Sequence, residues 1–388
     1  MKFHITEITK LSLINFFMHL FFLSPIIVFF FQQRGLDYFQ ILFLESVLVV
    51  FVVLFEIPTG IFADTIGRKK SIVVGTLLIA LEPVVFLFAD NFFWFAFAFA
   101  MSGIGIAFHS GSIEALMYDN LHPRNKEEEM KKSMGSYGSA SLIAMIIAPI
   151  IGSFLAKDLL MPQFILLILL TLGAMLTGFV TSLFIKDSQP KKVEKENPIV
   201  FFKCGVRLIG SNKSLLRIVL LSTFASPFLF AIMYLYQPYF KNSGVSTAIF
   251  GIVFAFSLLL AALLQRYAYK VEKKFGGRLT IFLSTILPGI FYVTMAFTFH
   301  PIWAILLFVL LRGTIGLQEP LFSAYKNVYI PSKNRATVLS LISMLTSLYL
   351  AGMMLIIGKV ADINVSYSFL FMGTIIIIAS ILLNIKYP

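Results

Sequence analysis

The chain alternates between long apolar stretches and short polar segments along almost its whole length. Twelve of the apolar stretches reach the roughly 20 residues that an α-helix needs to cross a bilayer. Polar and apolar positions do not alternate within them, as they would in the strands of a membrane barrel, so the pattern predicts helices. The predicted spans are about 10–32, 38–62, 71–90, 92–119, 133–157, 162–186, 214–240, 246–269, 279–299, 301–327, 334–359 and 365–385.

Composition supports the same class. Of the 388 residues, 59% are hydrophobic and only 13% are charged, against roughly 25% charged in an ordinary globular chain. These charges are too few to cover a water-facing surface, which argues against a soluble enzyme or a nucleic-acid-binding protein. We therefore expect an all-α membrane protein, a monomer whose partners are the lipid bilayer and a small-molecule substrate.

The sequence predicts no bound cofactor and no metal site. It contains no G-x-x-x-x-G-K-[ST] motif, so we expect a proton or other ion gradient, or the substrate gradient itself, to supply the energy. The single cysteine, Cys204, permits neither an internal disulfide nor a cysteine-built metal site.

The positions of the basic residues predict the orientation. The formal net charge is +12, and with both termini in the cytoplasm all but five of the 31 lysines and arginines fall on or near the inner side. We therefore predict a multi-pass protein of the cell membrane with cytoplasmic termini. The exceptions are Arg34, Lys157, Lys241 and Lys359 on the outer side, and Arg312 within a span.

A long polar loop divides the chain into two sets of six spans. The predicted domains are an N-terminal bundle, 1–186, a cytoplasmic linker, 187–213, and a C-terminal bundle, 214–388. Within the linker, 198–210 mixes apolar and basic residues, which suits a short amphipathic helix on the inner leaflet. A regulatory or partner-binding segment is the alternative.

The two halves share weak internal repeats, which predict parallel bundles and a two-lobed transporter with its substrate site near the midplane. Each match is a short motif, but the four occur in the same order at offsets of 202, 205, 207 and 210 residues. The pairs are Ser24-Pro25 with Ser226-Pro227, Pro83 with Pro288, Tyr118-x-Asn120 with Tyr325-x-Asn327, and Gly67-Arg68 with Gly277-Arg278.

The loop after the second span reads Gly60-Ile-Phe-Ala-Asp64-Thr-Ile-Gly67-Arg68-Lys69-Lys70. It resembles the G-x-x-x-D-x-x-G-R-[RK] signature of the major facilitator superfamily, at the expected place between spans two and three. The resemblance implies the fold of that superfamily, with twelve transmembrane helices in two pseudo-symmetric six-helix bundles. It also implies secondary transport and not enzymatic activity.

The same loop predicts a cytoplasmic gate formed by Gly60, Asp64, Gly67, Arg68 and Asp119. The glycines permit close packing and a tight turn, Asp64 can accept bonds from a facing helix N-terminus, and Arg68 can pair with the carboxylate of Asp119. In the family, an Asp–Arg–Asp arrangement of this kind latches the inner side shut in the outward-open state. Charges that only enforce orientation are the alternative.

A second resemblance concerns the fifth span, where drug/proton antiporters of the family often carry G-x-x-x-G-P-x-x-G-G. Here the stretch reads Ala144-Met-Ile-Ile-Ala148-Pro149-Ile-Ile-Gly152-Ser153, which keeps the proline, one glycine and small residues elsewhere. An R-x-x-x-G element common in span four has Phe99 in place of arginine, followed by Gly103. The branch implied is antiporter-like, with a departure from its usual proton relay.

Charges inside the predicted spans are the main candidates for substrate binding or proton coupling, because an intramembrane charge usually faces a cavity or a partner. In the family fold, spans one, four, seven and ten line the cavity, which selects Glu114, Arg312 and Glu319. Arg312 and Glu319 share a face of span ten, so an ion pair of Arg312 with Glu319 or Glu114 is the alternative.

The remaining candidates are a carboxyl and several polar side chains. Glu45 could accept a proton, because burial favours the protonated form, or it could simply reach the outer interface. Glu82, beside Pro83, is interpreted as a local structural acid. Polar residues that could touch substrate, or could form packing hydrogen bonds instead, are Asn15, His19, Tyr234, Tyr236 and Gln237.

These observations favour a proton-coupled exporter of hydrophobic or amphipathic small molecules that works by alternating access. The first alternative is a proton-coupled importer or a uniporter of a small metabolite, with Arg312 holding a substrate anion. The second is a membrane-embedded enzyme or sensor in a transporter-like shell, for which no catalytic cluster is visible in the sequence.

Overall fold

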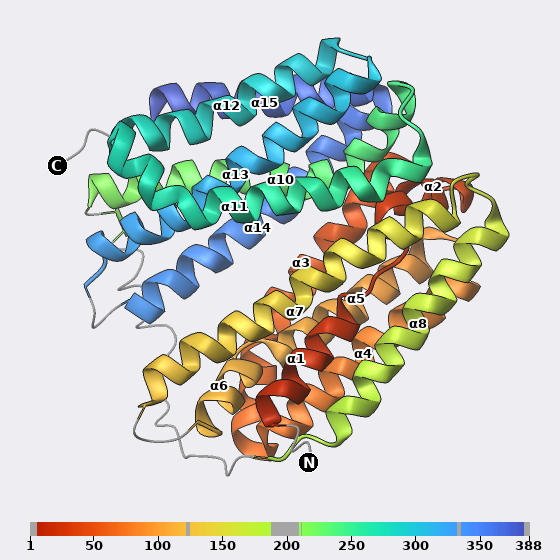
Figure 1. Ribbon diagram of the computed structural model, residues 1–388, viewed down its shortest axis with the longest axis vertical. Coiled ribbons are helices and arrows are strands. Elements are labelled where there is room, and N and C mark those ends of the chain that lie inside the picture. The colour runs from red at the N-terminus through yellow and green to blue at the C-terminus, as the bar shows by residue number, and fades with distance from the viewer. Residues whose placement is uncertain (1–5, 122–124, 188–208, 211, 332–334, 384–388) are drawn as a thin grey trace. The chain divides into compact units, whose positions relative to one another are not determined.

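The computed structural model describes residues 6–121, 125–187, 209–210, 212–331 and 335–383, and its regular elements are helices (Figure 1). Within this part of the chain, eleven helical segments are long and apolar enough to cross a membrane, and Ser24–Gln33 is a shorter apolar helix. The predicted all-α, multi-pass architecture is confirmed. Most of the predicted linker, including the amphipathic segment up to residue 208, lies outside the described residues.

The helices of the first half correspond to predicted spans one to six. Because proline, glycine and short polar runs separate the apolar stretches, most of the predicted spans end within a few residues of where the helices end. The elements are α1 (Glu7–Met18), η1 (Ser24–Ile26), α2 (Ile27–Gln33), α3 (Tyr38–Ile66), α4 (Arg68–Phe88), α5 (Phe92–His109), α6 (Ser112–Asp119), α7 (Lys126–Leu155) and α8 (Met161–Leu183).

The second half supplies spans seven to twelve as continuous helices. Prolines inside α10, α12 and α13 do not interrupt them. The elements are α10 (Lys213–Asn242), η3 (Thr247–Ile249), α11 (Phe250–Phe275), α12 (Gly277–Phe297), α13 (Pro301–Tyr329), α14 (Arg335–Ile363) and α15 (Val365–Leu382).

The chain forms two compact units, and each takes in a short segment from the other half of the sequence. The first unit contains α1 to α8 without the start of α3, and it includes Thr247–Ile252. There, the Ser153 hydroxyl accepts the Gly251 N–H at 3.1 Å. The second unit contains α10 to α15 without the start of α11, and it includes Asp37–Phe43, where the Asp362 carboxylate accepts the Tyr38 N–H at 2.8 Å.

The first predicted span is not one helix, which corrects the expectation of twelve uninterrupted spans. It unwinds after α1 and resumes at η1, where Pro25 occupies the first turn. Proline lacks an N–H and its ring collides with the carbonyl four residues earlier, which here belongs to Phe21. Within the break, Thr171 of α8 accepts the Phe22 N–H at 3.1 Å, so the unwound backbone is stabilised within the first unit.

The fourth span is interrupted as well, between α5 and α6. Gly111 takes a positive φ of 71° at the break, a conformation that glycine adopts without steric cost. Side chains of α4 hold both sides, because the Ser71 hydroxyl donates to the Phe108 carbonyl at 2.8 Å and accepts from Ser112 at 3.0 Å. Both breaks therefore lie in the first unit and are satisfied by neighbouring helices.

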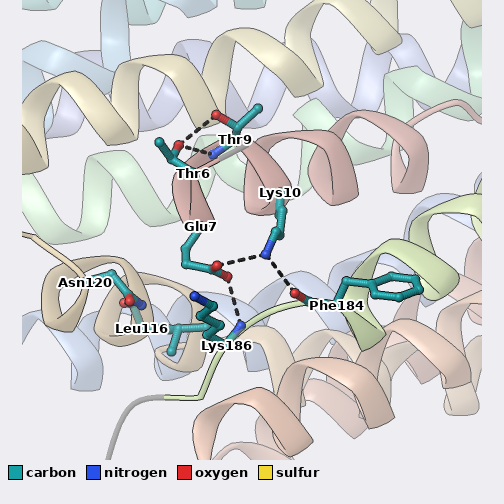
Figure 2. Close-up of polar contacts among 8 residues, drawn as sticks. All are labelled: Thr6, Glu7, Thr9, Lys10, Leu116, Asn120, Phe184 and Lys186. Atoms are coloured by element: carbon teal, nitrogen blue, oxygen red, sulfur yellow. Dashed lines mark hydrogen bonds and ion pairs between the residues drawn. The ribbon is translucent and has the colours of Figure 1, made fainter. Parts of the chain in front are cut away.

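The N-terminal turn of α1 is tied to the end of α8 (Figure 2). The Lys10 ammonium donates to Glu7 and to the Phe184 carbonyl, each at 2.8 Å, and Glu7 also accepts the Lys186 N–H at 2.9 Å. Partial burial acts to raise the pKa of Glu7, but the bonds from Lys10 and Lys186 together lower it. This clamp, formed by Glu7 and Lys10, therefore joins the start of the first helix of the predicted N-terminal bundle to the end of its last helix.

The internal repeat is visible in local geometry. The amides of Asn120 and Asn327 each donate to the carbonyl four residues earlier, in both cases at 2.9 Å. The glycine at the N-cap of the third span of each half, which is α4 in the first half and α12 in the second, also has a positive φ. The angle is 121° at Gly67 and 80° at Gly276. In the second half this glycine is Gly276 and not Gly277, one residue from the pairing suggested by the sequence.

Candidate functional site

The loop between α3 and α4 is held by an ion pair to the end of α6. The Arg68 guanidinium pairs with the Asp119 carboxylate, and its Nη1 also donates to the Ala115 carbonyl at 2.9 Å. Both charged side chains are largely buried, so water screens the pair less than it would at the surface. The predicted partnership of Arg68 with Asp119 is therefore present in the first unit.

A residue that the sequence interpretation did not select completes this loop. Asp187, just after α8, accepts the Lys69 N–H through Oδ1 at 3.2 Å. A Cβ added at Gly67 would lie 2.7 Å from its other carboxylate oxygen, so the positive φ and the close approach both favour glycine there. A carboxylate at the N-terminus of α4 also complements the helix dipole. Nothing in the sequence places residue 187 beside residue 67.

The other two members of the predicted gate behave differently. Asp64 is exposed, and it forms no ion pair with Arg68 in the described part of the chain. A Cβ added at Gly60 would meet no atom within 4 Å, so the close packing predicted for this glycine is wrong. The contacts of this loop therefore involve Gly67, Arg68, Asp119 and Asp187. Gly60 and Asp64 do not take part in them.

Two acidic residues of the first unit, Glu82 and Glu45, belong to the same region of its interior. The Ser102 hydroxyl of α5 donates to Glu82 of α4, and Glu45 of α3 is near enough to interact electrostatically with Glu82. Glu45 and Ser102 are buried, at 8% and 2% exposure. In the part of the chain that is described, Glu82 forms no ion pair with a basic group. The sequence interpretation missed this association because the three residues belong to three helices.

Among the candidate polar residues of the first and fourth spans, one is buried and the others are exposed. Asn15 is buried and donates to the Tyr137 carbonyl of α7 at 2.8 Å. His19 is exposed, and its Nδ1 lies 2.8 Å from the Asn15 carbonyl of its own helix. Glu114, in the first turn of α6, is exposed and interacts electrostatically with Tyr137. Asn15 and His19 thus each form a hydrogen bond, and a role of either residue in substrate contact stays a prediction.

In the second unit, Arg312 and Glu319 do not pair among the described contacts. Glu319 is exposed and accepts a long 3.4 Å hydrogen bond from Gln265 of α11. The Arg312 guanidinium instead lies over the Phe254 ring, with 5.8 Å from Cζ to the ring centroid. The ion pair of Arg312 with Glu319, considered from the sequence, is therefore not among the described contacts.

The polar residues predicted on span seven are mostly enclosed. Tyr236 is 1% exposed and stacks on Phe308, with 4.8 Å between ring centroids. Gln237 is fully buried and donates to the Met233 carbonyl of its own helix at 3.2 Å, while Tyr234 is half-buried. A small cavity lies nearby in this unit, lined by residues that include Phe228, Tyr292 and Gln318.

The arrangement offers charge and hydrogen-bonding groups inside an apolar body, without a grouping suited to metal chemistry. No group of three or more His, Cys, Asp or Glu side chains that could hold a metal occurs in the described ranges. These residues offer hydrogen-bonding and charged groups that can bind a solute. The chemistry suits recognition and movement of a solute.

Comparison with protein families gives a match over nearly the whole chain. The sequence model of the Major Facilitator Superfamily matches residues 11–353 and also residues 219–387. The second match covers only the C-terminal half. The first shows that the likeness extends far beyond the short motif at residues 60–70.

Individual relatives have low sequence identity to this chain, but the similarity extends over most of its length. The MFS-type transporter YxaM of Bacillus subtilis is 24% identical over 82% of this chain and 79% of its own. Macrolide efflux protein A of Streptococcus pyogenes is 24% identical over 83% and 81%. Among solved structures, the nucleoside transporter NupG superposes with a TM-score of 0.78 at 12% identity, covering 98% of this chain and 99% of its own. That last likeness concerns the fold alone.

Proposed function

Because this chain belongs to the Major Facilitator Superfamily, we propose that it exports hydrophobic or amphipathic small molecules in exchange for protons. It works as a monomer by alternating access. The observation that carries the proposal is its likeness, over more than four-fifths of both sequences, to a macrolide efflux protein. Macrolides combine a large apolar body with polar groups, and a mostly apolar protein interior with a few polar groups suits such solutes.

Proton coupling is assigned to the carboxyl pair of Glu82 and Glu45. Two carboxyls close together in an apolar interior are not ionised together without cost, so one of them favours a proton. Ser102 donates to Glu82, and rotation of this hydroxyl supplies a route for proton exchange. Glu114, which is exposed, and Glu319 remain candidates for a second site that contacts solute.

The gate is assigned to Arg68 and Asp119, supported by their ion pair and by the Asp187 contact that positions the same loop. The placement of the basic residues supports a cell-membrane protein with both termini in the cytoplasm. In that orientation the Arg68 loop and the Glu7–Lys10 clamp lie on the cytoplasmic side.

The experiment is transport into inside-out proteoliposomes under an imposed pH gradient, acid inside. The probes are neutral N-phenyl-1-naphthylamine, cationic ethidium and anionic 8-anilinonaphthalene-1-sulfonate. We expect wild type to concentrate at least one of them and to release protons as it does so. We expect Glu82→Gln to abolish the gradient-driven accumulation while exchange of labelled for unlabelled probe persists.

Glu128→Gln is the matched control, because Glu128 is an exposed acid paired with Lys132 on the surface of α7. Glu114→Gln and Glu45→Gln locate the proton site if Glu82→Gln remains coupled. Failure of wild type to move any of the three probes would refute export of amphipathic compounds. Accumulation only in the opposite direction would support import.

A further inference from the structure

Arg312 is a cation placed deep within a membrane-spanning helix. It is the twelfth residue of the 29-residue helix α13, so it stands about 17 Å from the start of that helix at 1.5 Å per residue. This depth places it inside the hydrocarbon core, which is about 30 Å thick. A charge at that level requires a partner or a polar cavity.

The described residues supply no such partner of opposite charge. The Arg312 Nε is buried without a hydrogen-bond partner, and no ion pair to its guanidinium occurs in the described ranges. Arg34 and Arg335 also have an unpartnered Nε, but they lie near the ends of helices. The side chain of Arg312 as a whole keeps partial exposure.

Aromatic side chains surround the guanidinium. Phe254 of α11 lies beneath it, and the side chains of Tyr236 of α10 and Tyr292 of α12 lie in its neighbourhood. Tyr292 is held in place because its hydroxyl donates to the Phe228 carbonyl at 2.7 Å. This group, called here the arginine–aromatic cluster, thus consists of Arg312, Phe254, Tyr236 and Tyr292, from four helices.

The backbone next to Arg312 fixes the cluster. A Cβ added at Gly313 would lie 2.8 Å from the Leu260 side chain, and one at Gly316 would collide with the Ala261 carbonyl. These glycines hold α13 directly against α11, which carries Phe254. The guanidinium therefore has a rigid aromatic support and does not depend on a flexible surface.

From this arrangement we infer that the arginine–aromatic cluster binds an anionic group, and that the solutes carried are amphipathic organic anions such as aryl carboxylates or sulfonates. The inference rests on the proposed export function and narrows its substrate class. An acidic group supplies the charge that the described residues lack and can form the bidentate bonds that a guanidinium favours. An aryl group packs on the surrounding rings, whereas a cationic amphipath is repelled.

The experiment measures binding, so that it does not depend on transport. Purified protein in nanodiscs is dialysed to equilibrium against ibuprofen, a carboxylate at pH 7, and against its primary amide, which has the same skeleton without the charge. The variants are Arg312→Gln, which removes the charge, and Arg312→Lys, which keeps it but loses the planar fork. Arg266→Gln is the control, because Arg266 is an exposed arginine of α11.

We expect wild type to bind the carboxylate at least tenfold more tightly than the amide. Arg312→Gln should lose that preference while amide binding changes less than threefold, Arg312→Lys should keep part of it, and Arg266→Gln should keep all of it. Equal affinity of wild type for the two compounds, or an unchanged preference in Arg312→Gln, would overturn the inference, and so would parallel loss of both compounds from Arg312→Gln and Arg312→Lys. If the protein binds the carboxylate selectively but transports none of the probes, the export proposal is refuted and the anion site is supported.

Discussion

Gly152 of α7 lies against the carbonyl oxygen of Phe22, so close that a Cβ built on the glycine would overlap that oxygen. Phe22 belongs to the unwound part of the first span, and Gly152 is the glycine retained in the antiporter-like element of the fifth. The small residue therefore has a definite structural role, which is to let a helix approach exposed backbone. Small residues serve the same purpose at helix contacts in membranes generally.

We expect Gly152→Ala to destabilise the protein by about 1–3 kcal/mol, the usual cost of overpacking a tight contact. The added methyl group must displace the Phe22 carbonyl or the whole of α7. Thermal unfolding in detergent, followed by size-exclusion chromatography, measures the effect. Gly173→Ala is the control, since a Cβ there meets nothing within 4 Å, and its melting temperature should hold or rise. Equal melting temperatures for the two variants would contradict the contact.

The Phe22 N–H gives a second prediction about the same break. Thr171→Val keeps the shape of the side chain but removes the acceptor of the 3.1 Å hydrogen bond. A buried donor left without a partner costs about 1–3 kcal/mol, so amide hydrogen exchange around residue 22 should become faster. Thr177→Val should leave exchange unchanged there, because Thr177 is exposed and its hydroxyl donates to the Gly173 carbonyl of its own helix. Unaltered exchange in Thr171→Val would show that another group accepts this N–H.

The sequence was sufficient for the helical class, the positions of the spans and the partnership of Arg68 with Asp119, because each depends on local composition or on a short motif. The broken first span could not be predicted. Ser24-Pro25 interrupts it, yet the matching Ser226-Pro227 lies within the continuous helix α10. What differs is the neighbourhood, since Thr171 and Gly152 accommodate the unwound backbone in the first case.

Associations between helices were equally out of reach. Glu82 was interpreted as a local acid beside Pro83, because nothing in the sequence brings Ser102 or Glu45 to it. The sequence does not predict the Asp187 contact for the same reason. It predicts close packing at Gly60, but the surroundings of this glycine are open. A motif identifies the residue types at a site, but the packing of the helices determines which of these residues are in contact.

The ion pair of Arg68 with Asp119 provides the third prediction, which a double-mutant cycle tests. Arg68 serves two acceptors, the Asp119 carboxylate and the Ala115 carbonyl, so removing either charge leaves the other largely buried and unpaired. We expect Arg68→Ala and Asp119→Ala each to lower stability by about 1–3 kcal/mol, as for a lost hydrogen bond to a charged group. The double variant should be little worse than either single one, because the remaining charge is then absent too.

The cycle formed by Lys132→Ala and Glu128→Ala is the control. That pair lies 2.8 Å apart, but its side chains are 73% and 69% exposed, and surface pairs contribute about 0–1 kcal/mol. Its coupling energy should therefore be small and should fall with added salt, whereas the coupling of Arg68 with Asp119 should persist at high ionic strength. If the effects of Arg68→Ala and Asp119→Ala simply add, the two residues are not coupled. The loop between α3 and α4 would then be held by the Asp187 contact alone.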